Sequence, residues 1–267
     1  SQIRQLEDAL GVALFERQRR RLVLTEPGRL TLGYADTVFE AGEGLLEMLR
    51  EGRRSEELLR IGAVATLSRN FQESFVQPLL HRPGVALLLQ SGGLDDLLAR
   101  LARHDLDVVL SNRPAPVGLG LAWRSVRLAR QQVSVVGGVR ARAFRFPEDL
   151  GTDPMILPGR DSAVRTEFDA LCARLGVSVH VQAEVDDMAT MRLVARDTRS
   201  LALLPSVVVR DELRQGVLVE HCAVPGLFEA FYAVTVERHF QHPLVSGLLE
   251  RGEAELLGND PGERHGV

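Results

Sequence analysis

Lysine is absent from the 267-residue sequence, and isoleucine, cysteine and tryptophan occur only three times, twice and once. All 32 basic residues are therefore arginine, a bias that reflects genome composition more than any mechanism. The formal net charge is −4, so the chain is not basic overall. Any affinity for nucleic acid must come from a local basic patch, and residues 17–21 form the densest one.

The two cysteines, Cys172 and Cys222, are too few for a disulfide framework. We therefore expect reduced thiols and a cytoplasmic protein. Cys172 falls in an apparent amphipathic helix, and Cys222 ends an apparent strand. These positions favour two buried, inert thiols, and a redox-sensing pair is the alternative.

Long hydrophobic runs and enzyme motifs are also missing. No apolar run approaches the roughly 18 residues that a membrane-spanning helix needs, and no signal peptide begins the sequence. The chain contains no nucleophile elbow, P-loop, zinc-protease motif or paired C-x-x-C. His239 and His242 are three apart, but no third ligand of a metal site lies nearby. The sequence predicts no catalytic residue, no cofactor, no resident metal and no membrane partner.

Residues 1–25 carry the most informative pattern in the chain. A helix is predicted at the start, because apolar residues recur at helical spacing and Gly11 stands where the helix would end. The apolar residues are Ile3, Leu6, Leu10 and Leu14. Thr25 can cap a second helix, with Pro27 in its first turn.

A β-hairpin is expected between these two helices. We predict its strands over residues 12–15 and 22–24, joined by an arginine-rich tip over residues 16–21. A helix followed by such a hairpin is part of a winged helix-turn-helix. In that motif the hairpin tip lies along phosphates while the helix enters a groove of DNA.

Four short motifs in this region resemble the DNA-binding signature of LysR-type transcriptional regulators, at the spacing of that family. The motifs are Gln2–Glu7, Leu10–Val12, Leu14–Arg17 and Leu24–Gly28. The resemblance implies that residues 1–27 are the carboxyl-terminal part of a winged helix-turn-helix, and we expect the chain to be truncated at its amino end. The residues expected to contact DNA are Gln2, Arg4, Arg17, Arg19, Arg20, Arg21 and Thr25. A surface hairpin with a charged tip is the alternative.

Residues 28–54 are predicted to form a linker helix that pairs two subunits. Apolar residues recur there every three or four positions, and a seam with a spacing of seven permits close contact between helices. They are Ala35, Val38, Phe39, Leu45, Leu46 and Leu49. The resemblance implies a homodimer through this helix, or a homotetramer through further contacts of the effector domains. A core helix of a single domain is the alternative, and residues 52–57 are predicted to be a polar hinge.

Strand and helix segments alternate over residues 58–256, which predicts parallel strands with helices on the faces of the sheet. Two similar α/β units joined by crossing strands resemble the periplasmic-binding-protein-like, Rossmann-like effector domain of LysR-type regulators. We place subdomain I at residues 58–130 and 232–256, and subdomain II at residues 131–231. A solute-binding protein of this fold with no DNA role is the alternative function.

The segments that join the two units are predicted as follows. An apolar stretch over residues 121–136 is interrupted by the polar residues 127–132. Separate strands are expected over residues 217–222 and 231–236, and one final helix over residues 243–257.

Several short motifs in the effector domain resemble the NhaR-type branch of the family, which activates sodium/proton antiporter genes in response to sodium. They are Leu157–Arg160 with Ser162 and Arg165, Glu184 with Asp186–Ala189, Phe231–Ala233, Glu237–Arg238 and Gln241–Pro243. This resemblance implies an activator whose effector is sodium.

A small effector is expected at the carboxyl ends of the strands, where helix amino ends point their free N–H groups in open α/β sheets. That rule selects Thr66, Ser68, Ser91, Asn112, Arg160, Ser162 and Asp187. Hydroxyl groups and one guanidinium would suit a small carboxylate or phosphate. The alternative for Thr66, Ser162 and Asp187 is that they only cap helices.

A cation is the second interpretation of the same region. Glu184 and Asp186 lie two apart on a predicted strand, so both side chains can face one side of the sheet. Their oxygens would then suit a hard cation.

Overall fold

The computed structural model describes residues 2–18, 21–51, 57–116, 123–236 and 242–258. The chain divides into two compact units, Ser1–Glu57 and Leu58–Val267, and each unit is described by itself. None of the helices within these described ranges has the length and apolar character needed to cross a membrane.

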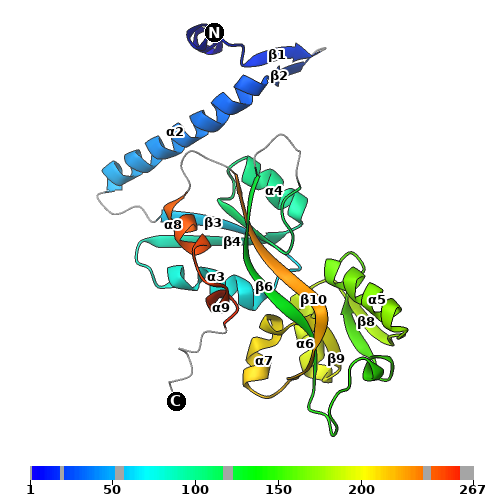
Figure 1. The fold of residues 1–267 in the computed structure, drawn as a ribbon. Coiled ribbons are helices and arrows are strands. Elements are labelled where there is room, and N and C mark those ends of the chain that lie inside the picture. The colour runs from blue at the N-terminus through cyan, green and yellow to red at the C-terminus, as the bar shows by residue number, and fades with distance from the viewer. Residues whose placement is uncertain (1, 19–20, 52–56, 117–122, 237–241, 259–267) are drawn as a thin grey trace. The chain divides into compact units, whose positions relative to one another are not determined.

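The first unit is a helix, a hairpin and a long helix (Figure 1). Its elements are α1 (Gln2–Leu10), β1 (Phe15–Gln18), β2 (Arg21–Leu24) and α2 (Glu26–Glu51). The strands are antiparallel, with Phe15 paired to Leu24 and Gln18 to Arg21. The first strand starts three residues later than predicted, so Arg17 and Arg21 lie on strands rather than in the tip. Arg19 and Arg20 lie outside the described residues.

Two side chains tie the hairpin to its neighbouring helices. Glu7 on α1 accepts hydrogen bonds from the amides of Leu14 at 2.7 Å and Phe15 at 3.1 Å. Thr25 donates from its hydroxyl to the Ala13 carbonyl at 2.6 Å and accepts from the Gly28 amide at 3.0 Å. Thr25 therefore caps α2 as predicted, and it also closes the base of the hairpin.

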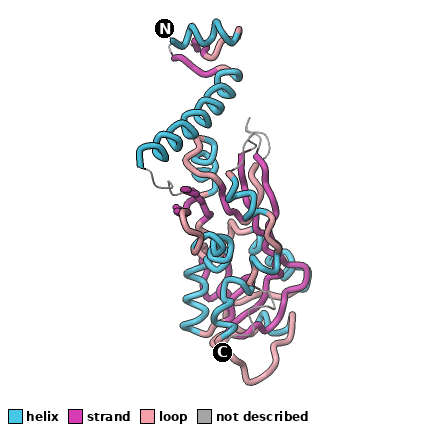
Figure 2. The backbone as a smooth tube through the Cα atoms, turned by 90° about the vertical axis from the view of Figure 1, so that its left-hand side faces the viewer, coloured by secondary structure: helices cyan, strands magenta, loops and turns pink. Residues whose placement is uncertain are grey.

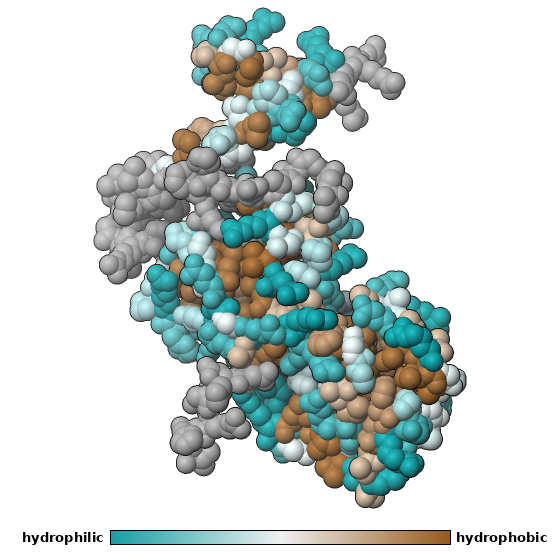
Figure 3. All heavy atoms as spheres, viewed as in Figure 1, coloured by the Kyte–Doolittle hydropathy of each residue, from teal (hydrophilic) through white to brown (hydrophobic). Residues whose placement is uncertain are grey.

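The long helix α2 runs without interruption over 26 residues (Figure 2). Val38 and Phe39 are 69% and 72% exposed on it. The side chains of Leu45, Leu46 and Leu49, which complete the predicted seam, lie outside the described set. Apolar side chains are also exposed on α1, and Figure 3 shows apolar atoms on the surface of this unit.

The second unit is built on one eight-stranded sheet with the order β4-β3-β5-β10-β6-β9-β7-β8. The strands are β3 (Glu57–Val64), β4 (Val85–Gly92), β5 (Val108–Ser111), β6 (Trp123–Gly137), β7 (Met155–Pro158), β8 (Val181–Val185), β9 (Leu201–Pro205) and β10 (Val219–Val236). The pairs β3·β5, β7·β8 and β7·β9 are parallel, as strand–helix alternation requires. The first half of the sheet thus contains β4, β3 and β5, and the second half contains β9, β7 and β8.

Helices connect these strands and cover the sheet (Figures 1 and 2). They are α3 (Arg69–Leu80), α4 (Leu94–Ala102), the 3-10 helix η1 (Glu148–Gly151), α5 (Ala163–Leu175), α6 (Met188–Thr198), the 3-10 helix η2 (Ser206–Val209), α7 (Arg210–Arg214), α8 (Pro243–Leu249) and α9 (Glu253–Leu256). The final helix was predicted as one element and is two, because Gly252 adopts an extended conformation and caps α9. The predicted boundaries between the subdomains stay predictions.

Two long antiparallel strands, β6 and β10, join the halves of the sheet as predicted, but the predicted breaks within these strands were wrong. Strand β6 runs straight through residues 127–132, and β10 continues from Val219 to Val236. Pro225 and Gly226, with φ of 75° at the glycine, do not end β10. They lie in an irregularity of the pairing between Ala223 and Phe228, and the strand resumes beyond it.

The two hydrophobic clusters of the second unit show how the halves are held. One cluster surrounds the first half and reaches across the sheet, and it includes Phe71 stacked on Phe231 with ring centroids 4.3 Å apart. The other lies in the second half and contains Phe168 and Met155, both fully buried. Since Phe71 lies on α3 and Phe231 on β10, this aromatic pair fixes α3 against a strand that belongs to both halves.

Alanine substitutions at two glycines of α2 are expected to change the stability of the first unit in opposite directions. A Cβ on Gly28 would lie 2.0 Å from the Leu14 carbonyl oxygen, whereas a Cβ on Gly33 would meet nothing within 4 Å. We expect Gly28→Ala to destabilise the first unit by about 1–3 kcal/mol, since backbone must move. Gly33→Ala should stabilise it by about 0.5–1 kcal/mol through the lower entropy of the unfolded chain. Hydrogen exchange of the peptides that cover residues 14–33 measures both, and equal protection in the two variants would contradict the packing at Gly28.

Candidate functional site

The carboxyl ends of two strands meet at the middle of the sheet. Strand β5 runs antiparallel to β10, and β9 runs antiparallel to β6. Because β6 and β10 are themselves antiparallel, β5 and β9 point toward each other from opposite halves. We call the place where they meet the junction, and define it by Asn70, Asn112, Gln131, Arg192, Val207 and Glu229.

One side of the junction is closed by backbone and amide groups. The Asn70 side chain on α3 donates to the Val207 carbonyl at 3.0 Å. The Val207 amide donates to the side-chain oxygen of Gln131 on β6 at 2.9 Å. Asn70 is only 6% exposed, so these bonds join the first half to the start of η2 in the second half within the protein interior.

Two arginines reinforce this side. Arg192 on α6 donates to Asn70 at 3.1 Å, to Glu212 at 2.8 Å and to Asp211 at 3.1 Å. Arg210 on α7 donates to the Ser74 hydroxyl on α3 at 2.8 Å. It also forms an ion pair with exposed Glu73 at 2.9 Å. The charge of Arg210 is therefore paired with Glu73 across the two halves, whereas the ion pairs of Arg192 lie within the second half.

The other side of the junction contains a buried carboxyl group. Glu229 on β10 is 6% exposed, faces Gln131 across the ladder and hydrogen-bonds to Asn112, which follows β5. Burial raises the pKa of Glu229 to about 7, and the negative charge of Glu167 on α5 adds to the rise, while the hydrogen bond from Asn112 opposes it. A carboxyl group with such a pKa changes its charge near neutral pH.

Among the residues predicted to bind an effector, Asn112 belongs to the junction, where it hydrogen-bonds to Glu229. Thr66 lies partly buried in the turn between β3 and α3. Ser68 is 2% exposed and its hydroxyl accepts from the Phe71 amide at 3.3 Å, as the cap of α3. The capping interpretation therefore accounts for Ser68.

Arg69 connects two further predicted residues. It donates to the Ser91 hydroxyl at 2.9 Å, and Ser91 belongs to β4 rather than to a turn after it. Its charge also acts on Asp187, which caps α6 by accepting from the Ala189 and Thr190 amides. Burial alone would raise the pKa of Asp187, but hydrogen bonds from Thr190 outweigh it and lower the pKa. Ser91 and Asp187 are thus associated through one guanidinium.

The remaining predicted residues do not form an anion pocket. Arg160 is 79% exposed and lies 3.4 Å from Glu184. Glu184 also accepts from buried Arg165 at 3.1 Å, and the two arginines lower its pKa. Ser162 occupies the cap position of α5, and its side chain makes no capping hydrogen bond there. Because the negative charge of Glu184 is already balanced by Arg160 and Arg165, Glu184 is also a poor partner for Asp186 in a cation site.

Sequence reasoning missed the residues that form most of the junction. Gln131 was treated as part of an interruption between apolar segments, and Glu229 as part of a connection between strands. A polar side chain inside an otherwise apolar strand is the signal that could have found both. Asn70 and Arg192 lie on helix faces and gave no such signal.

The two thiols favour the inert interpretation. Cys172 is buried in α5 and Cys222 partly buried in β10, and both are free. Burial raises the pKa of each thiol, with further contributions from Asp169 to Cys172 and from Glu220 to Cys222. A raised pKa leaves little reactive thiolate at neutral pH.

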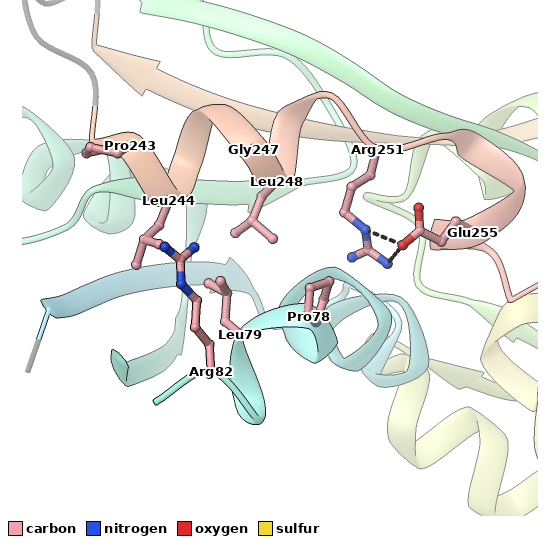
Figure 4. Close-up of a pocket in the computed structure, with 9 residues that line it drawn as sticks. All are labelled: Pro78, Leu79, Arg82, Pro243, Leu244, Gly247, Leu248, Arg251 and Glu255. Carbon is pink, nitrogen blue, oxygen red and sulfur yellow. Dashed lines mark hydrogen bonds and ion pairs between the residues drawn. The ribbon is translucent and has the colours of Figure 1, made fainter. Parts of the chain in front are cut away.

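A cavity of about 330 Å³ lies elsewhere, between the carboxyl end of α3 and α8 (Figure 4). Pro78 and Leu79 of α3, with Leu244 and Leu248 of α8, form its apolar wall, and Arg251 is held in an ion pair with Glu255. Pro78 follows the junction residue Asn70 by eight residues, or roughly 12 Å along the helix. The cavity is therefore separate from the junction.

The predicted DNA contacts are only partly described. Gln2, Arg4 and Arg17 are exposed. The Thr25 hydroxyl makes two hydrogen bonds within the chain. The side chain of Arg21, like Arg19 and Arg20, lies outside the described set. The exposed polar and basic side chains of α1 and β1 remain suited to contact a phosphate backbone.

Comparison with known families gives two matches that together cover most of the chain. Residues 1–29 match the bacterial regulatory helix-turn-helix protein of the lysR family, and residues 52–256 match the LysR substrate binding domain. The first match leaves the alternative of a solute-binding protein without a DNA role unsupported.

Characterised relatives agree with both matches. The chain is 27% identical to the transcriptional activator protein NhaR of Escherichia coli over 257 residues, which span 96% of this chain and 85% of that protein. It is 27% identical to a hydrogen peroxide-inducible genes activator of Dickeya chrysanthemi over 232 residues, 84% of this chain and 75% of the relative.

Solved structures share the fold. The LysR family regulator CbnR matches 93% of this chain and 87% of its own, with a TM-score of 0.57 and 16% identity. Vibrio fischeri DarR, solved in complex with DNA, matches the same shares with a TM-score of 0.58 and 18% identity. The helix-turn-helix segment, the two-half effector domain and these matches agree, and the chain belongs to the LysR family of bacterial transcriptional regulators and is not an enzyme.

Proposed function

We propose that this regulator binds DNA through its first unit and is controlled by a small effector bound at the junction of the second. The observation that carries the proposal is the meeting of polar side chains from both halves at the junction. A ligand there touches both halves at once, so it can favour one arrangement of the halves over another. The proposed effector residues are Asn112, Gln131 and Glu229, and the further candidates that the sequence selected are Thr66, Ser68, Ser91, Arg160, Ser162 and Asp187.

The effector that this geometry favours carries positive charge. Glu229 is a buried carboxyl group at the junction, the negative charge of exposed Glu167 on α5 also acts on it, and Arg160 is already paired with Glu184. A carboxylate or phosphate ligand would meet this negative potential, whereas a cation would relieve it. Because the effector-domain motifs resemble the NhaR-type branch, we propose that this cation is sodium and that the regulator activates sodium/proton antiporter genes. It would act in the cytoplasm, where the DNA is.

The DNA contacts predict a steep dependence of binding on salt. If Arg4, Arg17, Arg19, Arg20 and Arg21 each neutralise one phosphate, affinity should fall roughly 500-fold between about 50 and 200 mM salt. Arg17→Ala should reduce that slope by about one unit, because one counterion fewer is released. Fluorescence anisotropy with a labelled duplex measures the slope. Arg174→Ala, an exposed arginine on α5, serves as the control and should leave it unchanged. An equal slope in Arg17→Ala would show that β1 does not touch DNA.

The exposed residues of α2 predict assembly through this helix. Val38 and Phe39 are apolar side chains that are 69% and 72% exposed. Packing against a second copy of α2 would remove them from water, which is favourable. We expect a dimer or tetramer by light scattering, and a shift toward monomer in the double variant Val38→Asp, Phe39→Asp. Val139→Asp, at a position 76% exposed in the second unit, is the control and should keep the wild-type mass. A wild-type monomer would contradict assembly through α2.

Trp123 is the single tryptophan, and its fluorescence can be followed while an effector is added. It begins β6, eight residues before Gln131, and is partly buried against the main core. Sodium, but not matched potassium at constant ionic strength, should give a saturable change in its fluorescence. The change should disappear in Glu229→Gln and persist in Asp186→Asn. The same shallow drift with both salts would exclude direct sodium sensing and direct the search to organic cations.

A further inference from the structure

Glu229 differs from Glu212, the buried acid that pairs with Arg192, in how its negative charge is balanced. Glu212, at 4% exposure, accepts from Arg192 at 2.8 Å, so its charge is paired. Glu229, at 6% exposure, has Asn112 as its hydrogen-bond partner, and the charge that acts on it is the like charge of Glu167. An ionised carboxylate in the interior without a cation is costly, so the group tends to hold its proton instead.

The described residues of β5 and β6 beside Glu229 supply no cation that replaces that proton. On α5, Arg165 is buried and already bonded to Asp169, Glu184 and the Pro158 carbonyl. On the end of β5, Asn112 is neutral and the adjacent Arg113 is exposed. On β6, Gln131 faces Glu229 and is already bonded to Val207. Arg130 pairs with Ala230, so it lies on the opposite face of the ladder, stacked 3.7 Å above the Phe228 ring.

The contacts of Glu229 extend to both halves of the effector domain. Asn112 follows β5 in the first half, and Glu167 lies on α5 in the second. When the carboxyl group is protonated, it can donate to or accept from Asn112 and does not repel Glu167. When it is ionised, repulsion between Glu229 and Glu167 acts across the junction, and the buried charge draws in water.

We propose that Glu229 is a proton-binding site at the junction, and that loss of its proton loosens the contact between the two halves of the effector domain. The other side, held by Asn70, Arg192 and Arg210, stays closed and acts as the pivot. This device works without an effector, and it makes the regulator responsive to pH in addition to the ligand proposed above.

The direction of the pH effect follows from the raised pKa. Burial raises the pKa of Glu229 from the ordinary value of 4.5 to about 7. The folded domain therefore binds its proton more tightly than the unfolded chain does. The stabilisation is fully present below the unfolded pKa, and it is lost as pH rises through about 7.

The experiment is hydrogen exchange with mass spectrometry on the full chain at a series of pH values, from about pH 5.5, where Glu229 is mainly protonated, to about pH 8, where it is mainly ionised. Wild type and Glu229→Gln are compared at the same pH, so the intrinsic effect of pH on exchange cancels. At the higher pH, peptides that cover residues 108–116 and 163–170 should exchange several-fold faster in wild type than in Glu229→Gln. At the lower pH the two proteins should agree.

Two further variants make the result decisive. Glu220→Gln changes an exposed carboxyl group on the same strand and should retain the wild-type pH response. Glu167→Gln removes the like charge, lowers the pKa of Glu229 and should move the midpoint of the response to lower pH. If Glu229→Gln does not fold, the midpoint shift in Glu167→Gln decides alone.

Identical exchange of wild type and Glu229→Gln at all pH values would overturn the proposal, as would an unmoved midpoint in Glu167→Gln. These outcomes would leave the proposed DNA binding and the sodium response untouched, because those are measured by anisotropy and tryptophan fluorescence at a single pH.

Discussion

The antiparallel pairing of β6 with β10 is the constraint on which the second unit depends. Each of these strands crosses from one half of the sheet to the other, so they carry the register that sets both halves. Because β5 pairs with one and β9 with the other, their carboxyl ends are forced to the same place. The irregular pairing near Ala223 and at Phe231 adds twist locally without ending either strand. The positions of Gln131 and Glu229 at the junction follow from that register.

Local sequence patterns were sufficient wherever an element is stabilised by its own neighbours. Helices α5 and α6 begin directly after Ser162 and Asp187, which were predicted caps, and Asp187 accepts from amides two and three residues away. For α3 the predicted cap was Thr66, but Ser68 occupies that position and bonds to the Phe71 amide. The same patterns failed on β6 and β10, because a polar run or a Pro-Gly pair looks like an end when the partner strand is unknown. The partner lies about a hundred residues away, and pairing with it holds the strand through both irregularities.

The site was predicted less well than the fold, and for a related reason. Residues that cap helices are the same types that bind anions, so the rule of helix amino ends selected Ser68 and Asp187, whose side chains are already bonded within the chain. Asn112 was found because the rule also selects strand ends. Gln131 and Glu229 come together only through the register of the two crossing strands, which no local pattern reveals.

The two sides of the junction differ in how much free energy a ligand can gain there. Around Asn70 and Arg192, side chains from both halves are already hydrogen-bonded to one another, so a ligand would have to replace bonds that already exist. A replaced hydrogen bond gains little, because its net contribution is only about 1 kcal/mol. Around Glu229 a buried acid meets a like charge, so a proton or cation relieves an existing penalty. An effector shifts a conformational equilibrium only by its difference in affinity between the two states. A proton or a cation therefore has more to gain at Glu229 than at the hydrogen-bonded side around Asn70.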